Sequence, residues 1–294
     1  MRVLVVGATG FIGQRLVRAL NDAGHDVVAF SRSASEESFP EGVEPFDGDL
    51  GDPETLSGLC HGVDAAYYLI HSLTAENFAE LDREYARRFC EIATEAGVDR
   101  VVYLSGISGD EENLSPHLAS RREVESVLAE GSYDLTVLRA AVIIGAESAS
   151  FRILNDLTDR LPVMLVPKWV RTPCQPIGVR DAIAYLVAVL AADETRGETY
   201  DIGGPSVWSY ESLLKLTARE KGKRVFIVSV PVMTPALSSH WLRLTTDVQY
   251  AIARPLAESM RNPVTVDPEL DLQQVVPIDQ TPIEDAVREA LVSA

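Results

Sequence analysis

Three glycines near the start of the chain have the spacing of a phosphate-binding turn. The segment Gly7-Ala8-Thr9-Gly10-Phe11-Ile12-Gly13 follows the apolar run 2–6 and precedes an amphipathic segment of helical length. Gly7 permits a tight turn, Gly10 lets the backbone approach phosphate oxygens, and Gly13 lets the helix pack on the strand. Because backbone amides at a helix N-terminus bind anions, the pattern predicts a cradle for the pyrophosphate of a dinucleotide.

A second polar position bears on which dinucleotide would bind. The predicted strand 26–30 ends in Ser31-Arg32, where NAD-selective sites present a carboxylate to the adenosine ribose. The guanidinium of Arg32 suits a 2′-phosphate instead, so the sequence favours NADP(H) and leaves NAD(H) open. The alternative is that Arg32 is a solvated loop residue.

The remaining sequence supplies the elements that must position this turn. Apolar runs at 26–30, 65–70, 101–104 and 135–138 alternate with helical segments at 10–23, 53–60, 77–96 and 116–130. This alternation predicts an α/β fold, a Rossmann-type doubly wound parallel sheet. After about residue 149 the pattern loosens into proline-rich passages around a helix at 179–191 and a strand at 199–202.

The change of pattern suggests a division of the chain. We predict that residues 1–150 form the NAD(P)-binding Rossmann core. Residues 151–294 would complete that core, over about 176–202, and form a small C-terminal lobe on the substrate side. The segment 232–242 suggests an amphipathic helix that covers an apolar pocket or contacts a partner.

Composition excludes several classes of function. With 26 Lys and Arg against 44 Asp and Glu, the net charge is −18, which argues against binding of nucleic acid or anionic lipid except at a local surface. The only four lysines are Lys168, Lys215, Lys221 and Lys223, a balance that resembles a salt-adapted, haloarchaeal-type proteome. An ordinary acidic protein has the same signature, because charge reports on solubility rather than on origin.

Cysteines and apolar runs limit the remaining classes. Cys60, Cys90 and Cys174 form no CxxC pair, so we expect neither disulfides nor a metal site. We expect all three cysteines to be buried as small apolar residues. The longest apolar run, 182–192, is too short to span a bilayer, and no room for a signal peptide precedes the first strand. A cytoplasmic protein without a membrane span is expected.

Several motifs resemble those of the extended and atypical short-chain dehydrogenase/reductases over residues 1–205, among them Gly48-Asp49-Leu50 and Ser105-Gly106. Segments 68–72, 114–121, 161–164 and 201–205 resemble more narrowly an NmrA-like, NAD(P)H-binding subgroup. The resemblance implies that Asp49 and Leu50 lie near the adenine. It also implies that Leu69, Ile70 and His71 line the nicotinamide-ribose side, although His71 could equally lie on the rim.

The same resemblance exposes a departure in the reaction centre. Reductases of the family use a Tyr-x-x-x-Lys pair after the fifth strand, and the register here gives His117 and Arg121. We take His117 as the candidate proton donor, with Arg121 stabilising the cofactor or lowering the histidine pKa. Ser105 stands where the family serine contacts a substrate carbonyl. The alternative is structural: His117 caps or packs the helix start, and Arg121 pairs with a phosphate or carboxylate.

Two functions therefore remain open. The first is an NADPH-dependent oxidoreductase that acts on a small apolar carbonyl, enone or quinone-like substrate. The second is a nonenzymatic NADP(H)-binding redox sensor or a structural or accessory subunit, which the missing Tyr and Lys favour and which would bind a protein partner.

Overall fold

The central element is a parallel sheet of seven strands. The computed structural model describes residues 1–75, 77–109, 114–230 and 246–293. The strand order is β3-β2-β1-β4-β5-β6-β11, and all pairings are parallel. The strands are β1 (Arg2–Val6), β2 (Asp26–Ser31), β3 (Glu44–Asp47), β4 (Ala65–Tyr68), β5 (Arg100–Gly106), β6 (Asp134–Ala140) and β11 (Thr199–Ile202). This order confirms the predicted Rossmann-type fold.

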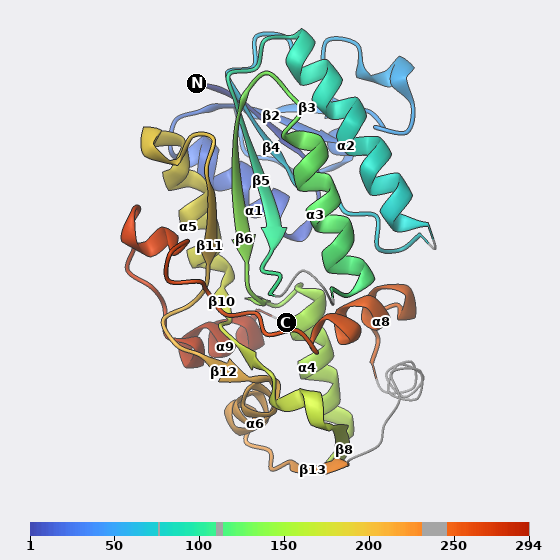
Figure 1. Ribbon diagram of the computed structural model, residues 1–294, viewed down its shortest axis with the longest axis vertical. Helices are drawn as coiled ribbons and strands as arrows, with labels where there is room; N and C mark the ends of the chain where they lie inside the picture. Colours follow the sequence, from blue (N-terminus) through green and yellow to red (C-terminus); the bar gives the residue numbers. More distant parts are fainter. Residues whose placement is uncertain (76, 110–113, 231–245, 294) are drawn as a thin grey trace.

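Helices cover both faces of the sheet, as the apolar strand sequences require. Residues 3–6 of β1 are fully buried, as expected for a strand with two covered faces. On one face α1 (Phe11–Asp22) packs beside α5 (Val179–Ala188), and on the other α2 (Phe78–Glu95) packs beside α3 (Pro116–Leu128) (Figure 1). The carboxyl ends of all seven strands therefore meet at one edge of the sheet.

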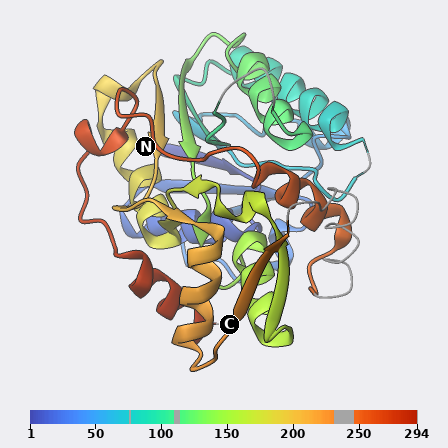
Figure 2. The same ribbon diagram turned by 60° about the horizontal axis from the view of Figure 1, so that its bottom comes forward.

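A smaller lobe lies at that edge. Figure 2 brings it in front of the sheet. Its core contains side chains that precede β11 in the sequence, such as Phe151, and side chains that follow it, such as Leu213 and Val287. Its main elements are α4 (Ala149–Arg160), β8 (Val163–Pro167), α6 (Tyr210–Glu220), β13 (Phe226–Val230), α8 (Tyr250–Ser259) and α9 (Ile283–Val292). Short strand pairs, β7 (Ile143–Ile144) with β10 (Ile177–Gly178) and β9 (Pro173–Cys174) with β12 (Trp208–Ser209), complete it.

Two predicted helices end three or more residues earlier than the sequence indicated. The segment 53–60 forms only a 3-10 turn, Pro53–Leu56, because the backbone of Ser57 leaves the helical region with ψ at 121°. The helix predicted to end at 191 ends at Ala188 and continues as the 3-10 turn Val189–Ala191.

Three other expectations can be compared with the structure. Cys60, Cys90 and Cys174 are buried and free, as predicted. Among the described helices, none is long and apolar enough to cross a membrane. The amphipathic helix predicted at 232–242 lies outside the described residues.

Candidate active site

The glycine turn joins β1 to α1 and forms an anion cradle. Gly7 adopts φ +95°, which side chains other than glycine rarely tolerate, and a Cβ on Gly13 would lie 2.1 Å from the Gly7 carbonyl oxygen. The first intrahelical hydrogen bond runs from Gln14 N to Gly10 O. The amides of residues 11–13 precede it and can donate to a phosphate, and the first turn holds no acidic side chain.

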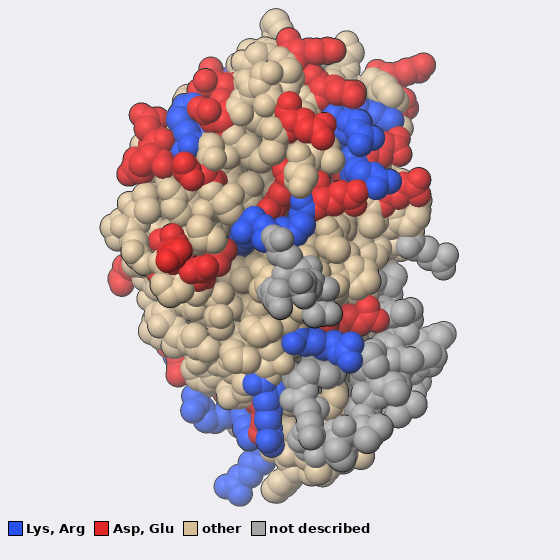
Figure 3. All heavy atoms as spheres, in the orientation of Figure 1, with Lys and Arg blue, Asp and Glu red and all other residues tan. Residues whose placement is uncertain are grey.

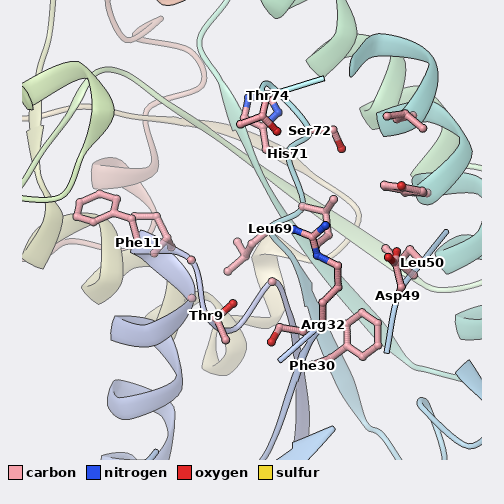
Figure 4. Close-up of a pocket in the computed structure, with 18 of the residues that line it drawn as sticks. Thr9, Phe11, Phe30, Arg32, Asp49, Leu50, Leu69, His71, Ser72 and Thr74 are labelled. Atoms are coloured by element: carbon pink, nitrogen blue, oxygen red, sulfur yellow. The ribbon is translucent and has the colours of Figure 1, made fainter. Parts of the chain in front are cut away.

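A groove of about 580 Å³ extends from this turn across the carboxyl ends of β1, β2 and β4. It brings together all thirteen residues that the sequence predicted for cofactor binding: Gly7, Thr9, Gly10, Phe11, Ile12, Gly13, Ser31, Arg32, Asp49, Leu50, Leu69, Ile70 and His71. In Figure 4 the side chain of Arg32 extends across the groove between Leu69 and Asp49. Arg32 itself is exposed. The groove therefore has backbone N–H donors at one end and the cationic side chain of Arg32 further along.

Other residues line the groove without having been predicted. They come from strand ends and the turns that follow them, from the loop after β4 and from α2, and they are Phe30, Ser33, Gly48, Ser72, Thr74, Ala75, Leu81, Tyr85 and Leu104. Tyr85 of α2 lines the groove, whereas Tyr67, Tyr68 and Tyr103 are fully buried in the sheet. Burial raises the pKa of all three buried phenols, so they are poor proton donors.

The loop residue His71 is held by a buried carboxylate. Its Nδ1 lies 3.2 Å from Oδ2 of Asp82 on α2, and Asp82 also accepts from the backbone amide of Ser72 at 2.8 Å. Burial acts to raise the pKa of Asp82, but these hydrogen bonds outweigh it and lower that pKa. Because an ionised carboxylate can only accept, Nδ1 of His71 carries the proton and Nε2 presents a lone pair. Nε2 is buried without a partner in the described part of the chain.

His71 should make stability depend on pH. Burial, together with the charge of Arg121, lowers its pKa to about 4, so protonation favours the unfolded chain. This contribution to stability is complete above the unfolded pKa and is lost as the pH falls from there towards 4. When the pH falls from about 7.5 to about 5, the free energy of unfolding of wild type should decrease by about 2 kcal/mol more than that of His71→Gln. Urea unfolding at the two pH values measures the difference. The exposed His61→Gln variant is the control, and equal losses in all three proteins would contradict the expectation.

A second cavity, of about 300 Å³, adjoins the groove. Both are lined by five common residues: Phe11, Ile12, His71, Leu104 and Arg121. The lobe closes the far side with side chains such as Tyr210, Leu256 and Met260. The predicted reaction residues Ser105, His117 and Arg121 all line this cavity. Its walls are otherwise mainly apolar.

His117 is buried beside His71 with ring centroids 4.9 Å apart. Its Nδ1 has no hydrogen-bond partner among the described residues. Burial, then the proximity of His71 and Arg121, lowers the pKa of His117 well below its usual value, so the ring is neutral. Ser115 rather than His117 caps α3, accepting from the amide of Leu118 at 3.3 Å. His117 therefore packs at the start of the helix but does not cap it.

Arg121 and Ser105 are fixed by neighbours in the sheet. Nη1 of Arg121 donates to the Tyr103 hydroxyl at 3.3 Å and to the Leu104 carbonyl at 3.2 Å, and no described carboxylate pairs with it. The Ser105 hydroxyl donates to Glu125 at 2.7 Å. Its proton is therefore engaged, so towards any further partner its oxygen can act only as an acceptor.

Glu125 connects the cavity wall to two arginines. This buried carboxylate accepts from Arg139 at 2.7 and 3.1 Å and from Arg122 at 3.0 Å. Burial raises the pKa of Glu125, against the opposing effect of the hydrogen bond from Ser105. The bidentate contact from β6 fixes the carboxylate, which in turn fixes Ser105.

Asp82 was missed as a positioning residue, although the sequence held a signal for it. It shares a face of α2 with Ala86, Phe89 and Ala93, at helical spacing and all buried. An acidic residue on an otherwise apolar helix face needs a buried partner, and that rule could have identified it.

Comparison with known proteins gives the family. A model described as NAD(P)H-binding matches residues 7–161, more than half of the chain. The chain belongs to this NAD(P)H-binding family. The match covers the glycine turn, the groove and the helix that carries His117 and Arg121, and it confirms the resemblance to the NmrA-like, NAD(P)H-binding group.

Three known proteins are similar to this chain. Photosystem II assembly factor Ycf39 of Synechocystis sp. is 27% identical over 239 residues, covering 79% of this chain and 71% of that protein. Ceramide reductase of Caulobacter vibrioides is 32% identical over 191 residues, covering 63% of this chain and only 60% of the reductase. Triphenylmethane reductase of Citrobacter sp., solved with NADP(H), shares the fold with a TM-score of 0.77, 19% identity and coverage of 99% and 100%.

Proposed function

We propose that this protein is an NADP(H)-dependent oxidoreductase that acts on a small apolar carbonyl, enone or quinone-like molecule. One observation carries the proposal: the dinucleotide groove and a mainly apolar cavity are lined by the same five residues, among them His71 and Arg121. A ligand in the cavity would therefore meet the end of a dinucleotide in the groove. Shared walls of this kind are what transfer between two bound molecules requires.

The groove residues divide into roles along a bound NADP(H). We assign the pyrophosphate to the amides after Gly10, the 2′-phosphate to Arg32, the adenine to Asp49 and Leu50, and the nicotinamide ribose to residues 69–71. The cofactor, when bound, supplies or accepts a hydride. The glycine cradle, which a Cβ at Gly13 would fill, supports the fit.

We assign Ser105, His117 and Arg121 to the reacting end. The guanidinium of Arg121 would stabilise negative charge that develops on a substrate oxygen in the mainly apolar cavity. The neutral ring of His117 carries one N–H that can donate a hydrogen bond to the same oxygen. The apolar lining would exclude water and select an apolar substrate. In this division, residues 1–150 hold the cofactor, while residues 151–294 complete the sheet and enclose the substrate.

Replacing Arg32 tests the cofactor assignment. We expect Arg32→Ala to weaken NADPH binding about 10- to 100-fold, because the contact to a 2′-phosphate is charge-assisted, while NADH binding stays unchanged. Nicotinamide fluorescence during titration with each nucleotide would measure both affinities. The control is Arg87→Ala, since Arg87 is an exposed arginine of α2 that does not line the groove. Equal weakening for both nucleotides, or none, would remove the NADP preference.

A nonenzymatic role is the second candidate. The positions of the family tyrosine and lysine hold His117 and Arg121, and His117 is buried and neutral. One relative is an assembly factor rather than a reductase by name. Oxidation of NADPH with menadione, cyclohexenone and a long-chain ketone separates the two. Turnover of any probe supports the enzyme, whereas tight binding of NADPH without turnover supports a sensor or accessory subunit.

A further inference from the structure

Strands β8 and β13 expose a strip of apolar side chains at the end of the lobe. Val163 and Leu165 of β8 are 54% and 53% exposed, and Phe226 and Val228 of β13 are 67% and 48% exposed. The parallel register places Val163 beside Phe226 and Leu165 beside Val228, so all four lie on one face. The alternate side chains of β8 are buried in the lobe core. We call these four residues the apolar strip.

The apolar strip is unusual within this molecule. Only three other large apolar side chains in the described residues are exposed, and these are Met1, Val207 and Val292. Scattered exposed apolar residues need no explanation, but a continuous patch on a regular surface indicates an interaction site. In Figure 1 the two strands of the strip lie at the bottom of the molecule, whereas α1, which follows the glycine turn, lies in the upper half, so an occupant would leave the cofactor groove open.

The charge around the strip differs from that of the whole chain. Segments 152–171 and 211–224, which lie next to the two strands in sequence, contain nine basic and four acidic residues, although the chain has 26 basic against 44 acidic. They include all four lysines. Arg160 and Arg224 stand three and two residues before the strands. In Figure 3 several Lys and Arg side chains lie at the bottom of the molecule with few acidic side chains among them, whereas the upper half carries most of the visible acidic side chains together with further Lys and Arg.

We propose that the apolar strip docks the protein on the surface of an anionic lipid membrane. Apolar side chains beside basic ones are the combination that binds at the headgroup boundary, where the former enter the acyl region and the latter contact anionic headgroups. A second copy of this chain is a poorer occupant, because it would bring the same basic segments face to face. The proposal is independent of any reaction in the cavity.

Flotation with lipid vesicles tests the docking. We expect the purified full chain to float with vesicles containing equal parts of phosphatidylglycerol and phosphatidylcholine, and far less with phosphatidylcholine alone. Phe226→Asp and Leu165→Asp should each lower the affinity for the anionic vesicles at least about tenfold. The matched control is Val292→Asp, because it adds the same charge to an 84% exposed apolar position on α9, outside the strip.

A charge variant tests the second half of the argument. Arg224→Gln should weaken binding to anionic vesicles about fivefold and leave binding to neutral vesicles unchanged. NADPH titration of each variant would show that it is folded. No flotation of the wild type, or equal losses in Phe226→Asp and Val292→Asp, would overturn the proposal. A dimer in sedimentation that Phe226→Asp dissociates would assign the strip to a second copy instead.

Discussion

Gly13→Ala is expected to lower the affinity for NADPH by about 100-fold or more, and to destabilise the fold by about 1–3 kcal/mol. A Cβ at this position would lie 2.1 Å from the carbonyl oxygen of Gly7 and 2.8 Å from two backbone atoms of Ala8. Backbone cannot rotate away as a side chain can, so α1 must shift relative to the turn. That shift would displace the amides of residues 11–13 that the anion requires.

The matched control for this substitution is Gly109→Ala. A Cβ at Gly109 would meet only the carbonyl oxygen of Pro263, at an ordinary 3.5 Å, and the residue is exposed. Fluorescence titration gives the affinity, and thermal unfolding without nucleotide separates loss of the cradle from loss of the fold. If Gly13→Ala bound NADPH within a few-fold of Gly109→Ala, the glycine turn would not be the anion site.

Glu125→Leu is expected to destabilise the protein by about 3–5 kcal/mol, because it leaves a largely buried arginine without its carboxylate. The side chain of Arg139 is only 15% exposed, and both of its bonds to Glu125 would be lost. The Ser105 hydroxyl would lose its acceptor and turn, so a reaction in the cavity should slow as well. Glu125→Gln keeps the shape and part of the hydrogen bonding, and should cost less.

The control for Glu125 lies two residues earlier on the same helix. Glu123 pairs with Arg83 on α2 at 2.7 Å, but both side chains are about two-fifths exposed. Glu123→Leu should therefore change the free energy of unfolding by no more than about 1 kcal/mol. Urea unfolding of the variants measures the difference. Similar losses for Glu123→Leu and Glu125→Leu would show that the buried network contributes no more than a surface ion pair.

Local features of the sequence were sufficient for the sheet and the cofactor groove. Apolar runs and the glycine turn at Gly7 act within a few residues, and carboxyl ends of parallel strands meet at one edge. Those rules placed Arg32 in the groove beside the glycine turn, and the family resemblance added Asp49 and Leu69, which line the same groove. The lobe could not be predicted in the same way. β8 pairs with β13 about sixty residues later, and neither short strand has a pattern that specifies its neighbour.

The reaction end shows the same limit at the level of side chains. Ser105, His117 and Arg121 were predicted from the family register, and they line one cavity. The carboxylates that orient the neighbouring side chains were not predicted. Asp82 reaches His71 from a different helix, and Glu125 meets Arg139 only because β6 lies beside β5. Contacts of this kind depend on the packing of whole elements, which spacing along the chain does not contain.

The path of the chain between sheet and lobe has a consequence for synthesis on the ribosome. β6 ends at Ala140, but its outer neighbour β11 begins only at Thr199, after α4 and β8 have been made. Asp201 of β11 then bridges Asp271, close to the C-terminus. A nascent chain that stops before residue 199 would present an unpaired edge of β6, which invites association with other chains. The sheet can therefore be completed only after β11 has been translated, and a chaperone that shields β6 until then should raise the yield of folded protein.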